Sequence, residues 1–327
     1  MVDQLSSVEI CRACGSPLGE NRGAGGELCD SCLARQWNGS TPDGSRQSDH
    51  DAAPRAAPIN DYYAAAAAQP EGPADPDRPG WGPLLGIGVW LFSVAAILLV
   101  PVAVVIVWYV LDKQRGVEVP LWTDRDALVE YLQSPRLLLV QIYSTIIAHL
   151  ISLGLCWMVV TRLKSRPFLK TLGWDWGRWH AARWLLFSFA VFMAIIGVDL
   201  ILSRVLPQSE SPFTQILNKS YQIKVAVAVL ATFSAPFVEE VIYRGVLFAG
   251  LRKFLGVRST VIAVTVLFAG VHVPQYWGQW ASIAGLLLLS LILTIVRART
   301  RSVLPCVVIH FVNNSIISLL LVLGLTS

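Results

Sequence analysis

The sequence predicts an all-α fold: a polytopic bundle of about seven transmembrane helices, preceded by a small amino-terminal zinc-ribbon-like module. Two observations predict the bundle. The 327 residues are 54% hydrophobic and 15% charged, against about 25% charged in a soluble domain, and long apolar runs begin only at about Trp81. Two CxxC pairs predict the module. The chain then divides into a head at residues 1–35, a linker at 36–80 and a transmembrane helical domain at 81–327.

The head has the cysteine spacing of a structural zinc site. Cys11 and Cys14 form one CxxC pair, and Cys29 and Cys32 form the second. Two such pairs can place four thiolates around one tetrahedral Zn²⁺ ion. The alternative is two disulfides, which a reducing cytoplasm disfavours. Four protein ligands leave no open catalytic position, so we expect a structural zinc ion and a head that recruits a protein partner.

The linker is rich in Pro, Ala, Gly, Ser and Asp and has almost no clustered aliphatic residues. Such a segment cannot bury enough apolar surface to offset the entropy of ordering, so we expect a flexible tether. The first twenty residues lack the apolar core of a secretory signal, which favours a cytoplasmic head. The net charge of +4 is spread over separate loops, and this distribution gives no argument for nucleic-acid binding.

Seven apolar segments follow the linker. Each except the fifth is long enough, or nearly so, for a helix to cross about 30 Å of hydrocarbon. The fifth is short and contains a histidine, which favours a half-buried or tilted helix. The segments are about Trp81–Leu111, Leu137–Thr161, Trp184–Leu206, Val225–Phe248, Thr260–Val273, Trp280–Val296 and Val303–Leu325.

The loop charges predict the orientation of these segments. The loop after the second segment, residues 162–183, is strongly basic with Asp175 as its single acid. The basic loops around Arg252 and around Arg299 fall on the same side when the spans alternate. Because basic loops stay in the cytoplasm, we expect a cytoplasmic amino terminus and an external carboxyl terminus.

The fourth segment contains three charged residues, although each costs at least about 2.5 to 3.5 kcal/mol at the bilayer centre. Glu240 and Arg244 are four residues apart and can form an intrahelical ion pair. Glu239 points about 100° away from that pair, so its carboxylate needs a hydrogen bond, water or a metal ion elsewhere. Pro236 removes a backbone donor just upstream and frees carbonyls near the same place.

Two later segments carry a histidine at similar depth. Phe268 and His272 are four residues apart on one helical face, and His310 and Asn314 repeat this spacing. A carboxylate and two imidazoles suit either general-base activation of water or a three-ligand catalytic metal site, and an amide suits oxyanion stabilisation. The plainer alternative is that each histidine only joins two helices. Helically spaced polar pairs in three segments favour one shared cavity.

With these residues the sequence resembles the CPBP family of intramembrane proteases, the group that contains the CAAX prenyl endopeptidases. The family motifs are EExxxR, FxxxH and HxxxN or HxxxD, and the resemblance covers about residues 225–327. Each motif alone is weak, whereas the ordered set on membrane helices is specific. The motifs are present in order as Glu239-Glu240…Arg244, Phe268…His272 and His310…Asn314.

The resemblance implies a membrane-embedded hydrolase that cleaves a peptide or protein substrate near the cytoplasmic half of the bilayer. It implies that Glu239 and His272 activate the attacking water. It assigns oxyanion stabilisation to His310 and Asn314. It leaves open whether a catalytic divalent metal ion takes part. Structural roles at the site fall to Glu240, Arg244 and Phe268.

Two other hypotheses for the function are alternatives to a protease. A non-catalytic membrane protein could use the same cavity for binding and the zinc head for recruitment. A transporter ranks lowest, because no inverted repeat is apparent. Outside the motifs, we expect His149 and Asp199 to form interhelical hydrogen bonds or to face a lumen, with support of the site residues as the alternative. We treat Cys156 and Cys306 as packing residues. The substrate itself cannot be deduced from these patterns.

Overall fold

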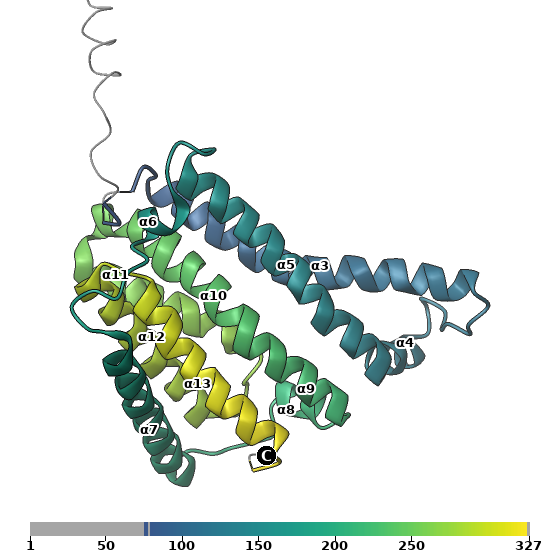
Figure 1. Cartoon of the computed structure of the whole chain (residues 1–327). Helices are drawn as coiled ribbons and strands as arrows, with labels where there is room; N and C mark the ends of the chain where they lie inside the picture. The colour runs from purple at the N-terminus through teal and green to yellow at the C-terminus, as the bar shows by residue number, and fades with distance from the viewer. Residues whose placement is uncertain (1–74, 78, 326–327) are drawn as a thin grey trace, which may run out of the picture. The chain divides into compact units, whose positions relative to one another are not determined.

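The computed structural model describes residues 75–77 and 79–325 (Figure 1). The predicted zinc-ribbon head, with its four cysteines, and nearly all of the predicted linker lie outside these residues. The described part is helical, as the apolar segments predict, and its only β-type pairing is an isolated bridge between Gln208 and Gln279.

Two of the elements, η1 and η2, are π-helical turns, and the remaining elements are α-helices. Several α-helices begin with a proline in their first turn, where no amide donor is needed. In chain order the elements are α3 Pro83–Gln114, α4 Arg125–Leu132, α5 Pro135–Thr161, α6 Phe168–Leu172, α7 Ala181–Val205, α8 Pro212–Leu217, α9 Tyr221–Val229, η1 Leu230–Ser234, α10 Ala235–Glu240, η2 Val241–Leu247, α11 Phe248–His272, α12 Trp280–Thr300 and α13 Leu304–Val322.

Six helical stretches of the described residues are long and apolar enough to cross a membrane. The sequence predicts about seven, and the difference arises because Tyr221–His272 includes both the fourth and the fifth predicted segment. This stretch is not straight. The Tyr243 and Phe268 rings lie 5.1 Å apart, whereas a straight helix would separate these residues by about 37 Å. The chain therefore turns back at Gly256, where φ is +74°, a conformation that glycine adopts readily.

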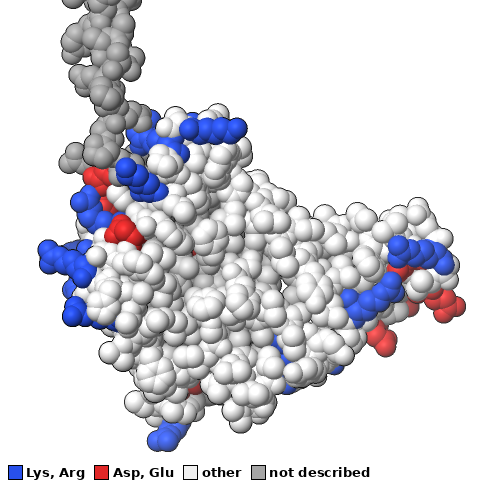
Figure 2. All heavy atoms as spheres, in the orientation of Figure 1, with Lys and Arg blue, Asp and Glu red and all other residues white. Residues whose placement is uncertain are grey.

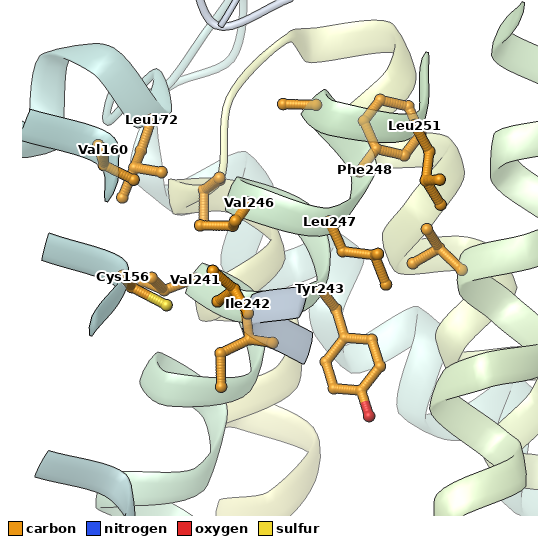
Figure 3. Packing of buried hydrophobic residues seen from close by; sticks show 14 of the residues in the cluster. Cys156, Val160, Leu172, Val241, Ile242, Tyr243, Val246, Leu247, Phe248 and Leu251 are labelled. Carbon is orange, nitrogen blue, oxygen red and sulfur yellow. The ribbon is translucent and has the colours of Figure 1, made fainter. Parts of the chain in front are cut away.

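The helices that carry Glu239, His272 and His310 are α10, α11 and α13. α3 packs along α5, α7 packs on α12 and α13, and α11 packs against α12 and α3. The pair α3 and α5 extends away from the other helices toward its α4 end (Figure 1). The residues of η2 are buried and pack on α5 and α6 through Cys156, Val160 and Leu172 (Figure 3). Cys156 and Cys306 are buried free thiols in the core, as expected for packing residues.

The outer surface of the bundle is that of a membrane protein. Large apolar side chains such as Leu98, Leu186 and Ile262 are well exposed, and a soluble monomer rarely exposes apolar surface on this scale. In Figure 2, lysine, arginine and acidic residues gather toward the edges of the visible face, with a wide uncharged surface between them. Together with the six candidate spans, this surface identifies an integral, multi-pass membrane protein.

Candidate active site

A cavity of about 480 Å³ lies between α3, α5, η1, α10, α11 and α13. The structure places four of the predicted site residues on the wall of this one cavity, although they come from three separate helices. These residues are Glu239, His272, His310 and Asn314.

Beside the cavity, Glu240 and Arg244 form the predicted intrahelical ion pair. Arg244 Nη1 donates to Glu240 Oε1 at 2.9 Å, and both side chains are fully buried. Arg244 Nη2 also donates to the Oγ and the carbonyl of Ser290 on α12, at 2.9 and 3.1 Å. The guanidinium lies over the Phe268 ring, 4.7 Å from its centroid. Arg244 thus has an ion-pair partner, a hydrogen-bond acceptor and an aromatic ring around its guanidinium. These contacts connect η2, which carries Arg244, to α10, α12 and α11.

Glu239 has a different environment from its neighbour Glu240. Its side chain is 17% exposed, lines the cavity, and has Oε2 3.9 Å from His310 Nε2. No closer ion pair of Glu239 exists among the described residues. The helical twist separates the two carboxylates as the sequence predicts: Glu240 faces the buried arginine, while Glu239 is accessible to water in the cavity and available as a base.

His310 connects the two glutamates. Its Nδ1 lies 2.8 Å from Glu240 Oε1, and because the paired carboxylate accepts hydrogen bonds, Nδ1 carries the hydrogen. Nε2 then faces Glu239. When Nε2 is also protonated, the imidazolium can donate a hydrogen bond into the cavity, which is the chemistry that an oxyanion requires.

His272 is oriented by its own helix. Its Nδ1 lies 2.8 Å from the Phe268 carbonyl, and a carbonyl only accepts, so Nδ1 is the donor. The lone pair is therefore on Nε2, where the ring can act as a base or as a hydrogen-bond acceptor. The Phe268 ring packs against both histidine rings, with centroids at 4.9 Å for His272 and 5.9 Å for His310.

Asn314 supports the helix that carries the glutamates. Its Nδ2 donates to the Ala231 carbonyl at 2.9 Å. In a π-helical turn the amide of residue 236 would serve this carbonyl, but Pro236 has no amide hydrogen. Asn314 thus replaces the donor that the proline removes. The second amide hydrogen of Asn314 is available for another acceptor, and neighbouring Asn313 donates to its Oδ1 at 3.2 Å.

The cavity contains a further histidine, outside the motifs. His149 on α5 is buried, lines the cavity and has Nδ1 2.7 Å from Ser234 Oγ. It thus forms an interhelical hydrogen bond and faces a cavity, the two positions that we expect for it from the sequence. Asp199 accepts a hydrogen bond from Ser282 at 3.4 Å, between α7 and α12, as expected.

The side chains of the site do not form a metal site in this structure. Within residues 75–77 and 79–325, no three His, Cys, Asp or Glu side chains are grouped so that they could hold a metal ion.

Fold and site together define a class of protein: a multi-pass membrane protein with an accessible glutamate, two oriented histidines and an amide around one cavity. Comparison with known families agrees with this class. Residues 221–316 match the family model described as Type II CAAX prenyl endopeptidase Rce1-like. The match covers less than a third of the chain and includes every motif residue, and it indicates a membrane peptidase. No curated protein and no solved structure matches the chain.

Proposed function

We propose that the protein is an intramembrane endopeptidase that hydrolyses a peptide bond with a water activated by Glu239 and His272. The observation that carries this proposal is the shared cavity, in which an accessible carboxylate lies with an imidazole whose Nε2 bears a lone pair. Such groups can remove a proton from water near neutral pH. The family match to residues 221–316 supports the same reaction class.

The reaction then proceeds by general-base hydrolysis. Glu239 takes a proton from the water while His272 Nε2 orients it, and the oxygen attacks the scissile carbonyl carbon. The resulting oxyanion accepts hydrogen bonds from His310 Nε2–H and from the second hydrogen of Asn314 Nδ2. When the carbon–nitrogen bond breaks, Glu239 returns its proton to the leaving nitrogen. The products are one new carboxyl group and one new amine, and Glu239 is ionised again.

We propose an apolar, lipid-modified or membrane-embedded peptide as the substrate class. A second cavity of about 910 Å³ shares Ile97 and Leu98 with the catalytic cavity. Its wall is aliphatic along α3, with polar residues such as Gln141 and Asn218. A long apolar chain fits such a space, in agreement with the prenyl substrates that the family description names. The test compares the peptides released by membranes with wild-type protein and with the Glu239→Gln variant.

The amino-terminal head remains a proposal of its own. We propose that Cys11, Cys14, Cys29 and Cys32 bind one structural zinc ion and that the head recruits a protein partner. We expect about one zinc per chain in the purified full-length protein, because four thiolates complete a tetrahedral site. Metal analysis by plasma mass spectrometry should show this zinc lost in a Cys11→Ser, Cys14→Ser variant. Equal zinc content in the variant would contradict the assignment.

We propose a cytoplasmic amino terminus and an external carboxyl terminus, on the basis of the basic loops. The expected result concerns cysteine labelling in intact cells. A cysteine introduced at Lys164 should be protected from a membrane-impermeant maleimide, and one introduced at Trp277 should react, since both positions lie in loops between helices. Labelling before and after permeabilisation measures this difference. The reverse pattern would invert the orientation.

A further inference from the structure

The segment that leads into α3 is bound to the backbone of the catalytic motif. This lead-in segment comprises residues 75–77 and 79–82. Trp81 Nε1 donates to the Val246 carbonyl of η2 at 3.0 Å, and Arg162 at the end of α5 donates to the Gly80 carbonyl at 3.1 Å. The composition predicts a flexible linker as far as residue 80, yet Trp81 and the Asp77 side chain are both 7% exposed. The packed domain therefore begins before residue 81.

Arg297 connects the lead-in segment to the motif a second time. Its Nη1 is 3.1 Å from Asp77 Oδ1, and its Nη2 donates to the Pro76 carbonyl at 2.9 Å. Its Nε donates to the Arg244 carbonyl at 3.0 Å. All three guanidinium nitrogens thus have partners, and the side chain is 1% exposed. By its position in the basic loop around Arg299, Arg297 counts among the charges that predict topology. The structure shows it as a buried bridge between the lead-in segment and η2.

The carboxylate of Asp77 compensates several cations. It pairs with Arg297, with Arg252 on α11 and with Arg301 after α12. Burial opposes ionisation of Asp77, but the Arg252 and Arg297 guanidiniums outweigh it and hold the pKa of this carboxyl below its usual value. Asp77 is therefore charged at neutral pH. Without that charge, the buried Arg297 loses the counter-ion that keeps it in place.

The two carbonyls held in this way, of Arg244 and Val246, both belong to η2. In a π-helical turn each backbone hydrogen bond spans five residues instead of the four of an α-helix, and such turns are frequent at functional sites. The same turn carries the Arg244 side chain, which binds Glu240, and Glu240 binds His310. A shift of η2 would move this chain of contacts, and a displacement of about 1 Å at a catalytic group can reduce the rate about 100-fold.

We propose that Asp77 is a positioning residue for the catalytic site: through Arg297 it holds η2, so that full activity requires the lead-in segment to be docked. The activity part of this inference rests on the proposed peptidase function. Since most of the lead-in segment is the end of the predicted linker to the head, the amino-terminal region can influence catalysis through it.

Hydrogen–deuterium exchange of full-length protein in lipid nanodiscs tests the positioning role without any substrate. We expect faster exchange of the Val241–Leu247 amides in Asp77→Asn than in wild type, because Arg297 no longer holds the turn. Asp112→Asn is the matched control, since Asp112 is also buried and binds Arg136 and Tyr131, at the far end of α3. It should leave these amides unchanged. Wild-type exchange of η2 in Asp77→Asn would overturn the proposal.

Activity provides the second readout, with an internally quenched farnesylated peptide that ends in a CAAX sequence as probe. We expect Asp77→Asn to lower the maximal rate per folded molecule at least about 10-fold with an unchanged half-saturating concentration, and Asp77→Glu to restore most of it. An unchanged maximal rate would contradict the proposal. If wild type leaves this probe intact, the substrate class is wrong, and exchange alone decides the positioning role.

A milder variant covers the case in which Asp77→Asn does not fold. Trp81→Phe keeps an aromatic ring under α11 but removes the donor to the Val246 carbonyl. We expect this variant to fold and to exchange faster around Val246, with a smaller loss of maximal rate than Asp77→Asn. Exchange and rate equal to wild type would show that the lead-in segment does not hold η2.

Discussion

Replacing Glu239 by glutamine should abolish peptide release while the protein stays folded in the membrane. Glutamine has nearly the same size, so packing around the cavity is kept, but it cannot take a proton from water. General-base catalysis contributes about 100- to 10,000-fold to such reactions, and we expect at least that loss. Glu239 has no close ion pair among the described residues, so no buried cation is left without its partner. Mass spectrometry of the released peptides, normalised to folded protein, measures the effect.

His272→Ala should produce a similar loss, since it removes the imidazole that orients the water. Glu130→Gln is the matched control, because Glu130 is exposed on α4 outside the cavity. This control should release peptides at the wild-type rate. Full turnover by both Glu239→Gln and His272→Ala would refute the assignment of the water-activating role to these two residues.

The helices and the contacts within one helix could be predicted from the sequence, because they depend on local periodicity. Apolar runs located the spans to within a few residues, and the spacing of Glu240 and Arg244 predicted their ion pair. The spacing also predicted that Glu239 points away from this pair. In the structure it lines the cavity. Regular helical geometry was sufficient for these inferences.

Features that depend on distant partners could not be predicted. The end of the fourth apolar segment and the start of the fifth predicted a reversal between them, but its exact position rests on one φ angle, at Gly256. In each π-helical turn a carbonyl accepts a hydrogen bond from a side chain of a distant element, Ala231 from Asn314 and Arg244 from Arg297. A count of loop charges treats Arg297 as one more cytoplasmic cation. Only the folded chain shows that it is buried between an aspartate and the motif backbone.

Removing either member of the Glu240–Arg244 pair should reduce stability more than any other single charge change in the membrane domain. Arg244→Ala leaves the fully buried Glu240 carboxylate without its cation, and it also removes the hydrogen bonds to Ser290. Breaking a buried pair in this way costs about 3 to 5 kcal/mol. We expect a low yield of folded protein and a clearly lower midpoint in a thermal unfolding assay in detergent.

Arg258→Ala is the control that separates the loss of a buried ion pair from the loss of any arginine. Arg258 is exposed on α11, and its loss should leave folded yield and the thermal midpoint near wild type. The double variant Glu240→Ala, Arg244→Ala should lose less stability than the sum of the two single variants, since neither charge is then left alone. Additive losses would show that the two residues do not depend on each other.

Glu240 also binds His310 Nδ1 at 2.8 Å. Glu240→Gln should therefore lower the turnover of the molecules that do fold, in addition to the loss of stability. This carboxylate thus links stability and catalysis.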